Sequence, residues 1–236
     1  MNKLEYRLKR LRRLLGSLPK TLYFNYHYLP FQQAVKLPIW VYKADLVCTR
    51  GKVVIDCPTI KTGMITMGYR DTSIYANNGI MWENKGGTVV FKGICRIGND
   101  SYISIGEKAT VTFGNDFRCS AAMKLVSKKE IRFGTCVSIG WDTVIMDTNI
   151  HSIYDIERKR YKKNCGPIAI GDYNWFGTGC KVMHSVSTPE RCIFGAGTIV
   201  TRNTPAKSYC IMSGTSVRIL TENVMRDFEH DDIHET

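Results

Sequence analysis

A histidine stands in a polar segment near the middle of the chain, in the stretch MDTNIHSIYD. The neighbours of this residue, His151, include Asp147, Thr148, Asn149 and Ser152. An imidazole titrates near neutral pH and can take a proton from a hydroxyl group, which is the task of a general base. The same surroundings equally suit a surface-loop histidine without a catalytic role. The residues alone leave both interpretations open.

The elements that must position this histidine are indicated by a six-residue repeat further along the chain. The first series of the repeat is Ile170, Phe176, Val182, Thr188, Phe194 and Val200. The second series is Asn174, Cys180, Val186, Cys192 and Thr198. An amphipathic helix repeats near 3.6 residues and a half-buried strand repeats at 2, so neither explains this spacing.

A period of six is typical of a solenoid in which each side is a short strand followed by a turn. Three sides make a triangular coil, and the coils stack by parallel backbone hydrogen bonds about 4.8 Å apart. Residues 46–220 are therefore predicted to form a parallel β-helix of the all-β class. The repeat breaks at 148–167, which predicts a loop insertion. Residues 221–236 are predicted to be an acidic tail, either a short helix or a frayed end.

The pattern apolar-Gly-x-x-small-x resembles the hexapeptide-repeat acyltransferases. The stretches GDYNWFGTG, FGAGTIVTRNTP and SGTSVRIL look like the C-terminal half of that family's acetyltransferase branch. The resemblance covers roughly residues 90–220 and implies a left-handed β-helix and an acetyl-CoA-dependent O-acetyltransferase. Residues 1–45 look, more weakly, like the front of polysaccharide-modifying members. The implied acceptor is a sugar hydroxyl in a capsule, O-antigen or other surface-polysaccharide precursor.

The resemblance also implies roles for single residues. His151 becomes the general base, and Asp147 or a backbone carbonyl is expected to orient it. Asn149 either holds the acceptor sugar or shapes the turn, and a backbone N–H near Thr178 is expected to stabilise the oxyanion. The residues expected to bind acetyl-CoA are Trp175, Thr178, Ala196, Thr201, Arg202 and Arg218. Each also has a structural alternative; Ala196, for example, is simply a small turn residue.

Family members form trimers with the cofactor groove between adjacent β-helices. The resemblance therefore implies a homotrimer in which one subunit supplies His151 and another completes the pocket. The inserted loop carries a basic run of Arg158, Lys159, Arg160, Lys162 and Lys163. This run is expected either to contact an anionic acceptor or CoA phosphates, or to be a solvated charged face.

The same solenoid can carry other functions. An N-acetyltransferase acting on an amino sugar nucleotide and a non-catalytic trimeric scaffold both remain alternatives. The zinc carbonic anhydrases of hexapeptide type need three histidines around a shared metal. The repeat region has only His151 and His184, so no metal is expected.

The net charge of +12 is concentrated at particular places in the chain. Residues 1–20 hold seven Lys or Arg against the single acid Glu5, and no basic platform interleaved with aromatics is visible. Nucleic acid is therefore not an expected partner. The nine cysteines include no CxxC pair and no zinc spacing. Cys180 and Cys192 fall on the repeat, which predicts buried thiols in a reducing compartment.

The N-terminal segment has its own pattern. Leu4, Leu8, Leu11 and Leu15 follow helical spacing with basic residues between them, which predicts a short basic amphipathic helix before an aromatic-rich cap within residues 1–45. This helix either packs on protein or lies on an anionic membrane surface. No run of apolar residues is long enough to span a bilayer, and no signal-peptide pattern is present. The sequence predicts a cytoplasmic protein. If the helix lies on a membrane, residues 1–20 are expected to contact the inner face of the plasma membrane peripherally.

Overall fold

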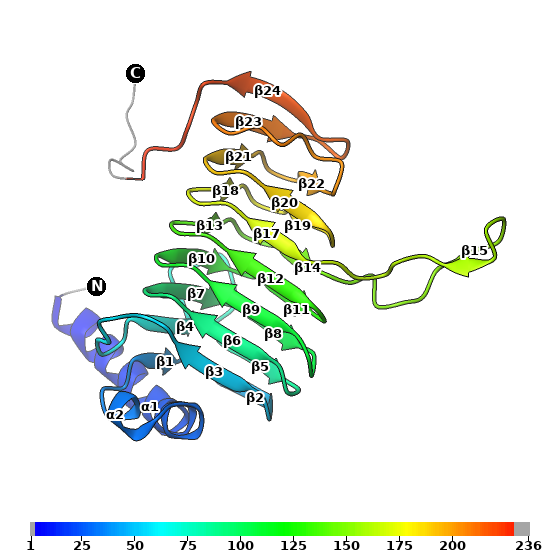
Figure 1. Cartoon of the computed structure of the whole chain (residues 1–236). Helices are drawn as coiled ribbons and strands as arrows, with labels where there is room; N and C mark the ends of the chain where they lie inside the picture. Colours follow the sequence, from blue (N-terminus) through cyan, green and yellow to red (C-terminus); the bar gives the residue numbers. More distant parts are fainter. Residues whose placement is uncertain (1–2, 229–236) are drawn as a thin grey trace, which may run out of the picture.

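Three short strands and three turns make each coil of the chain, and the coils stack into a left-handed parallel β-helix (Figure 1). The computed structural model describes residues 3–228, with side chains from residue 15 onward. The three flat sides are sheets A, B and C, and within each of them neighbouring coils pair in parallel, apart from the last pair of sheet A. The architecture predicted from the six-residue repeat and the family resemblance is confirmed.

The strands of each sheet are given in their spatial order. Sheet A contains β1 (Ile39–Val41), β4 (Ile65–Tyr69), β7 (Cys95–Asn99), β10 (Phe117–Ala121), β13 (Ser138–Ile139), β18 (Trp175–Phe176), β21 (Cys192–Phe194), β23 (Cys210–Ser213) and β24 (Arg218–Glu222). Sheet B contains β2 (Ala44–Thr49), β5 (Ile80–Asn84), β8 (Ser101–Ile105), β11 (Lys124–Ser127), β14 (Val144–Met146), β19 (Lys181–Val182) and β22 (Ile199–Val200). Sheet C contains β20 (Val186–Thr188), β17 (Ile168–Ile170), β12 (Glu130–Phe133), β9 (Thr110–Phe113), β6 (Thr88–Phe91) and β3 (Lys52–Ile55).

The inside of the coil is filled by the repeat residues. Every member of both six-residue series is buried. Aromatic side chains stack from coil to coil, as in the Phe176–Phe194 pair with ring centroids 4.6 Å apart. The buried amide of Asn174 donates to Thr188 Oγ1 at 2.7 Å and accepts from the Cys192 amide. The second series therefore admits a polar residue because its hydrogen bonds are satisfied inside the coil.

Two helices close the N-terminal end of the coil. They are α1 (Lys3–Tyr28) and α2 (Phe31–Ala34). Side chains of α1 satisfy the open edge of β1: Asn25 Oδ1 accepts from the Ile39 amide at 3.2 Å and Thr21 Oγ1 accepts from the Val41 amide at 3.2 Å. The first coil thus begins at Ile39, ahead of residue 46, because α1 supplies the bonds that a preceding strand would make.

The C-terminal end is closed by a strand. β24 runs antiparallel to β23, with Arg218 opposite Ser213. Thr221 and Glu222, expected to begin an acidic tail that is helical or frayed, belong instead to this strand. An antiparallel hairpin is a short way to cover the last edge of sheet A. Residues 223–228 of the predicted tail form neither helix nor strand, and residues 229–236 lie outside the described residues.

A hairpin arm leaves the coil between β14 and β17 and projects away from the stack (Figure 1). Its strands are β15 (Tyr154–Asp155) and β16 (Arg160–Tyr161), paired antiparallel. The arm occupies the predicted insertion at 148–167. The predicted buried thiols of Cys180 and Cys192 are indeed buried and unpaired. Among the helices that the structure describes, none has the length and apolar character needed to cross a membrane.

Candidate functional site

The predicted site residues divide between two edges of the triangular coil. We call the turns from sheet A to sheet B the A/B corner, and the turns from sheet B to sheet C the B/C corner. His151, Thr201 and Arg202 follow strands of sheet B, so they lie at the B/C corner. Thr178 and Ala196 follow strands of sheet A, so they lie at the A/B corner. Sheet B separates the two groups within one chain.

His151 stands at the base of the arm with its side chain exposed. Its backbone amide donates to the Asn149 carbonyl at 2.7 Å. The preceding residue, Ile150, has φ +65°, a left-handed conformation that a β-branched residue rarely adopts. No hydrogen bond engages the imidazole among the residues that the structure describes. The geometry leaves His151 free to meet a substrate hydroxyl.

Asp147 has a different task from the one predicted. Its side chain is fully buried, and its carboxylate accepts from Ser127 Oγ at 2.7 Å, the Lys128 amide at 2.7 Å and the Lys129 amide at 2.8 Å. Ser127 ends β11, and Lys128 and Lys129 begin the turn after it, one coil away. Because its carboxylate is engaged there, Asp147 does not orient His151 within the described chain. Asp147 stabilises the B/C corner below the arm, and of the two orienting groups left open by the sequence these contacts favour a backbone carbonyl.

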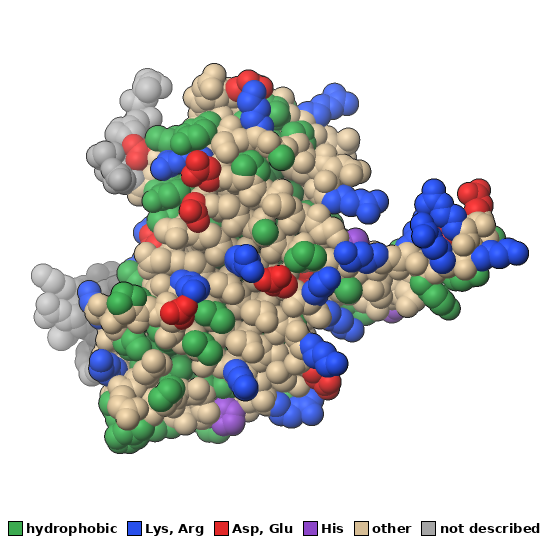
Figure 2. Space-filling view, viewed as in Figure 1, with side chains coloured by type: hydrophobic (Ala, Val, Ile, Leu, Met, Phe, Trp, Pro, Cys, Tyr) green, Lys and Arg blue, Asp and Glu red, His purple; other side chains and the backbone are tan. Residues whose placement is uncertain are grey.

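The B/C corner carries a basic hollow, which we call the arm hollow, with a volume of about 770 Å³. Asn149, His184, Thr201 and Arg202 line it from the coil. The arm adds four cations to its lining, Arg158, Arg160, Lys162 and Lys163. Figure 2 shows the concentration of blue side chains on the arm and at its root. The hollow has the charge needed to hold phosphate or carboxylate groups.

The A/B corner carries a second hollow, which we call the tryptophan hollow, with a volume of about 420 Å³. Trp141, Trp175 and Thr178 line it. Thr178 Oγ1 donates to the Trp141 carbonyl at 3.0 Å, while the Thr178 amide makes no hydrogen bond within the described residues. A Cβ built on Gly177 would lie 2.8 Å from the Ala196 nitrogen, so backbone from successive coils comes close together here. A narrow strip of backbone with one available amide is what a pantetheine arm or an oxyanion requires.

Sequence reasoning missed the arginines of the tryptophan hollow. Arg96 and Arg118 pair in register on adjacent strands, and Ser138 and Trp175 continue the same outward column on sheet A. Arg226 comes from the C-terminal segment, with its guanidinium 4.9 Å from the Trp175 ring and a 2.9 Å bond to Ser138 Oγ. The alternation of each strand would have placed Arg96 and Arg118 outside. The alignment of Arg96 and Arg118 from one coil to the next depends on turn lengths that the repeat does not specify.

One carboxylate accompanies these arginines. Asp71 lines the tryptophan hollow from the turn after β4. Burial raises the pKa of Asp71, and the positive charge of Arg96 acts in the opposite direction. The hollow therefore combines cations, two indoles and a partly desolvated carboxyl group.

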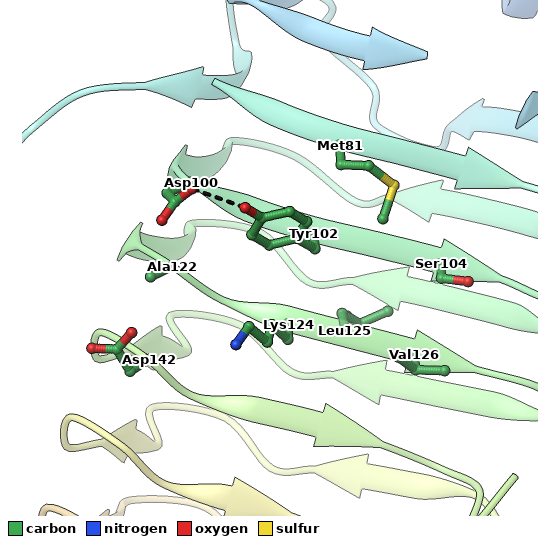
Figure 3. A pocket seen from close by; sticks show the side chains of 9 residues that line it. All are labelled: Met81, Asp100, Tyr102, Ser104, Ala122, Lys124, Leu125, Val126 and Asp142. Carbon is green, nitrogen blue, oxygen red and sulfur yellow. Dashed lines mark hydrogen bonds between the residues drawn. The ribbon is translucent and has the colours of Figure 1, made fainter. Parts of the chain in front are cut away.

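Arg218 and a further large hollow lie apart from these two hollows. Arg218 is exposed at the start of β24 and lines neither hollow. A further hollow of about 500 Å³ lies on the outer face of sheet B, where Met81, Tyr102 and Val126 come from successive strands (Figure 3). Tyr102 donates to Asp100 there at 3.1 Å. None of the predicted site residues lines this third hollow, so the reaction is not assigned to it.

Comparison with curated proteins gives two relatives with the same description. The chain is 25% identical over 126 residues to a galactoside O-acetyltransferase of Escherichia coli (strain K12), a match covering 53% of this chain and 60% of the relative. It is 30% identical over 111 residues to a galactoside O-acetyltransferase of Lactococcus lactis, covering 47% of this chain and 53% of the relative. The chain therefore spans little more than half the length of the curated relatives it matches. No family model matches it.

Comparison with solved structures gives the fold independently. The structure of the polySia-specific acetyltransferase NeuO superposes with a TM-score of 0.52 at 20% identity, covering 79% of this chain and 89% of that one. The chain resembles the hexapeptide-repeat acetyltransferases in both sequence and fold. A group of three or more His, Cys, Asp or Glu side chains fit to hold a metal is not found in the part of the chain with described side chains.

Proposed function

We propose that the chain is an acetyl-CoA-dependent O-acetyltransferase that modifies a sugar hydroxyl of a capsule, O-antigen or other surface-polysaccharide precursor. The observation that carries the proposal is His151, an exposed imidazole at the base of the arm without a hydrogen-bond partner among the described residues. His151 itself does not line the arm hollow, but it stands two residues after Asn149, which does. The relatives named galactoside O-acetyltransferase support a sugar hydroxyl as acceptor. The name of the NeuO structure supports a polysaccharide acceptor.

The proposed reaction is a direct transfer. His151 takes the proton of the acceptor hydroxyl as its oxygen attacks the thioester carbonyl carbon of acetyl-CoA. The carbon–sulfur bond then breaks, an ester forms, and the imidazolium returns the proton to the departing CoA thiolate. The amide of Thr178 is the proposed donor to the oxyanion of the tetrahedral intermediate. The imidazole would be oriented by a backbone carbonyl or by a group of another subunit, since Asp147 is engaged elsewhere.

The division of residues between corners supports a homotrimer. His151, Thr201 and Arg202 lie on one side of sheet B, and Trp175, Thr178 and Ala196 lie on the other. A head-to-tail contact between copies brings the B/C corner of one subunit next to the A/B corner of its neighbour, and such contacts close into a three-membered ring when copies are related by a 120° rotation. We propose that acetyl-CoA lies between these corners, with its phosphates near Arg202 and the arm and its thioester near Thr178. The exposed Arg218 is proposed to contribute charge at the far end of this groove.

The experiment measures CoA thiol release from acetyl-CoA with a panel of sugars, nucleotide sugars and lipid-linked glycans. We expect wild type to release thiol with one acceptor class, and His151→Ala to lower kcat by about 10²–10⁴-fold. Thermal stability should be unchanged, since the imidazole makes no hydrogen bond to the described chain. His184→Ala is the matched control: His184 lines the arm hollow but its Nδ1 already lies 3.1 Å from Ser185 Oγ, so most activity should remain.

The products decide between acceptor types. An alkali-labile ester identifies O-acetylation, whereas a stable amide on an amino sugar nucleotide identifies N-acetylation. Full activity of His151→Ala would remove the proposed base while keeping the enzyme. No thiol release by wild type with any acceptor, together with no binding of CoA, would favour the scaffold alternative.

A further inference from the structure

The outer surface of the two N-terminal helices carries an apolar stripe that the fold itself does not use. Its members in the described chain are Leu15, Leu22, Tyr26, Phe31 and Val35, all of them exposed. Phe31 is 68% exposed and Tyr26 50% exposed, and their rings lie 6.3 Å apart. Large side chains at such exposure on a soluble end-cap indicate a binding surface when they are contiguous.

The opposite face of α1 already makes the contacts that hold the helix in place. Thr21, Phe24 and Asn25 are fully buried. Phe24 packs edge-on against Trp82 with centroids 5.2 Å apart, and Asn25 Nδ2 donates to the Ile39 carbonyl at 2.6 Å. The stripe is therefore not needed to anchor α1 on the coil.

The sequence extends the stripe toward the N-terminus and surrounds it with positive charge. Leu4, Leu8 and Leu11 continue the spacing that leads to Leu15 and Leu22. Residues 1–20 contain seven Lys or Arg against one Glu, and the exposed Lys36 follows Val35. An apolar stripe flanked by cations fits the boundary between anionic headgroups and acyl chains.

We propose that the stripe, with its basic flanks, docks this end of the β-helix on an anionic lipid surface. A second copy of the chain fits less well, because packing two stripes together would bring two strongly positive flanks into contact. The helices close one end of the stack, whereas the arm leaves it further along (Figure 1). Figure 2 shows apolar side chains gathered over the α2 end of the molecule, away from the basic arm. Docking there leaves the arm hollow and the tryptophan hollow accessible.

The proposal does not depend on the acetyltransferase assignment, but it would bring the enzyme close to an acceptor held on a lipid carrier. In the proposed trimer, three copies with parallel coil axes would present their stripes at the same end. Simultaneous contact of three stripes would strengthen binding by avidity without any new contact.

The test uses the full chain and sedimentation with vesicles of phosphatidylcholine alone or mixed with phosphatidylglycerol. We expect wild type to bind only the anionic vesicles and to be released by high salt. The double variant Leu22→Ser/Phe31→Ser should bind at least about tenfold more weakly. The matched control is Leu220→Ser, because Leu220 is 63% exposed at the opposite end of the stack, and it should bind like wild type.

A second variant separates charge from apolar contact. Arg12→Gln/Arg13→Gln keeps every apolar residue of the stripe and should also weaken binding to anionic vesicles. Thiol release with a soluble acceptor should be unchanged in both double variants, so a failure of docking is distinguishable from a failure of catalysis. The proposal is overturned if wild type does not bind anionic vesicles, or if the apolar variant binds them as well as wild type does. It is also overturned if Leu22→Ser/Phe31→Ser changes the oligomeric state but not vesicle binding, since the stripe would then be an interface with a second copy.

Discussion

Hydrogen bonds hold the backbone of the segment from Asp147 to His151 in place, while the imidazole of His151 stays available. Asp147 accepts three hydrogen bonds from the end of β11 and the turn after it, and Thr148 Oγ1 accepts from the Ile150 amide at 2.9 Å. The Asn149 carbonyl accepts from the His151 amide. The proposed base, His151, would thus be held in place before a substrate arrives, which lowers the entropic cost of positioning it.

Asp147→Asn tests whether this carboxylate is structural. The new amide group would face N–H donors, so we expect a loss of about 1–3 kcal/mol in the free energy of unfolding, measured by chemical denaturation. The pH dependence of kcat/KM should keep its wild-type form, since Asp147 makes no hydrogen bond to His151 among the described residues. Asp56→Asn, which breaks the exposed pair with Lys92, should cost less than about 1 kcal/mol. A displaced pH profile with unchanged stability would instead assign Asp147 to the base.

Ile150→Asn tests the strain next to the base. Ile150 is exposed and has φ +65°, where a β-branched residue costs roughly 1–2 kcal/mol and Asn is tolerated. We expect Ile150→Asn to raise the free energy of unfolding by about 1 kcal/mol. Ile156→Asn removes an equally apolar side chain that is 82% exposed and not in this conformation, and it should stay within about 0.5 kcal/mol of wild type. Equal effects of the two substitutions would show that loss of exposed apolar surface, and not strain, is being measured.

At the scale of the element, the A/B corner is a column of closely stacked backbone. A Cβ on Gly140 would lie 2.6 Å from the Gly177 carbonyl carbon, and one on Gly177 would lie 2.8 Å from the Ala196 nitrogen. Both glycines are therefore required by the close approach of successive coils, because neither neighbour is a side chain that can turn aside. This stacking also exposes the Thr178 turn to a ligand.

Gly177→Ala should separate these coils. We expect a loss of about 1–3 kcal/mol in the free energy of unfolding and weaker binding of CoA, measured by thermal unfolding and calorimetry. Gly16→Ala is the matched control, since nothing lies within 4 Å of its added Cβ on exposed helix α1. That substitution should stabilise the chain by about 0.5–1 kcal/mol and leave CoA binding unchanged. If Gly177→Ala folded and bound CoA like wild type, the A/B corner would accommodate a Cβ at position 177, contrary to the close approach of the Ala196 backbone.

The sequence predicts the coil best where every turn has the same length. From Ile170 to Val200 the six-residue spacing identified each buried position, because side chains of a regular coil return to the interior at fixed intervals. Earlier coils have turns of different length, such as the segment between β4 and β5 that carries Asp71. There the repeat does not fix which outward residues align, so the Arg96–Arg118 pair was not predicted. The hydrogen bonds of Asp147 could not be predicted either, because their donors come from another coil.

At the scale of the whole molecule, one chain holds two incomplete halves of the proposed site. His151 and the arm lie on one side of sheet B, and Trp175, Thr178 and Ala196 lie on the other. The sequence placed all of these residues in one site through family resemblance. Because sheet B separates these residues within one chain, they can form a single site only where the corners of two copies meet.

Subunit mixing tests this arrangement directly. His151→Ala removes the base, and Ala196→Trp fills the strip above Gly177 where the donor is proposed to lie. Each variant alone should be nearly inactive as a homotrimer. Mixed trimers are formed by unfolding and refolding an equal mixture of the two variants. A site in them is intact when an Ala196→Trp copy supplies His151 and the neighbouring His151→Ala copy supplies Ala196. Random mixing should make about a quarter of all sites intact in a head-to-tail ring.

Two controls make the outcome decisive. Refolding each variant alone under the same conditions gives the background rate of thiol release. A mixture that is not unfolded keeps its homotrimers and should stay at that background. Recovery of about a quarter of wild-type activity only after joint refolding would mean that base and donor strip belong to different subunits. A refolded mixture that forms mixed trimers but remains inactive would mean that one chain holds the complete site, so that His151 and Ala196 must approach each other across sheet B by a movement of the arm.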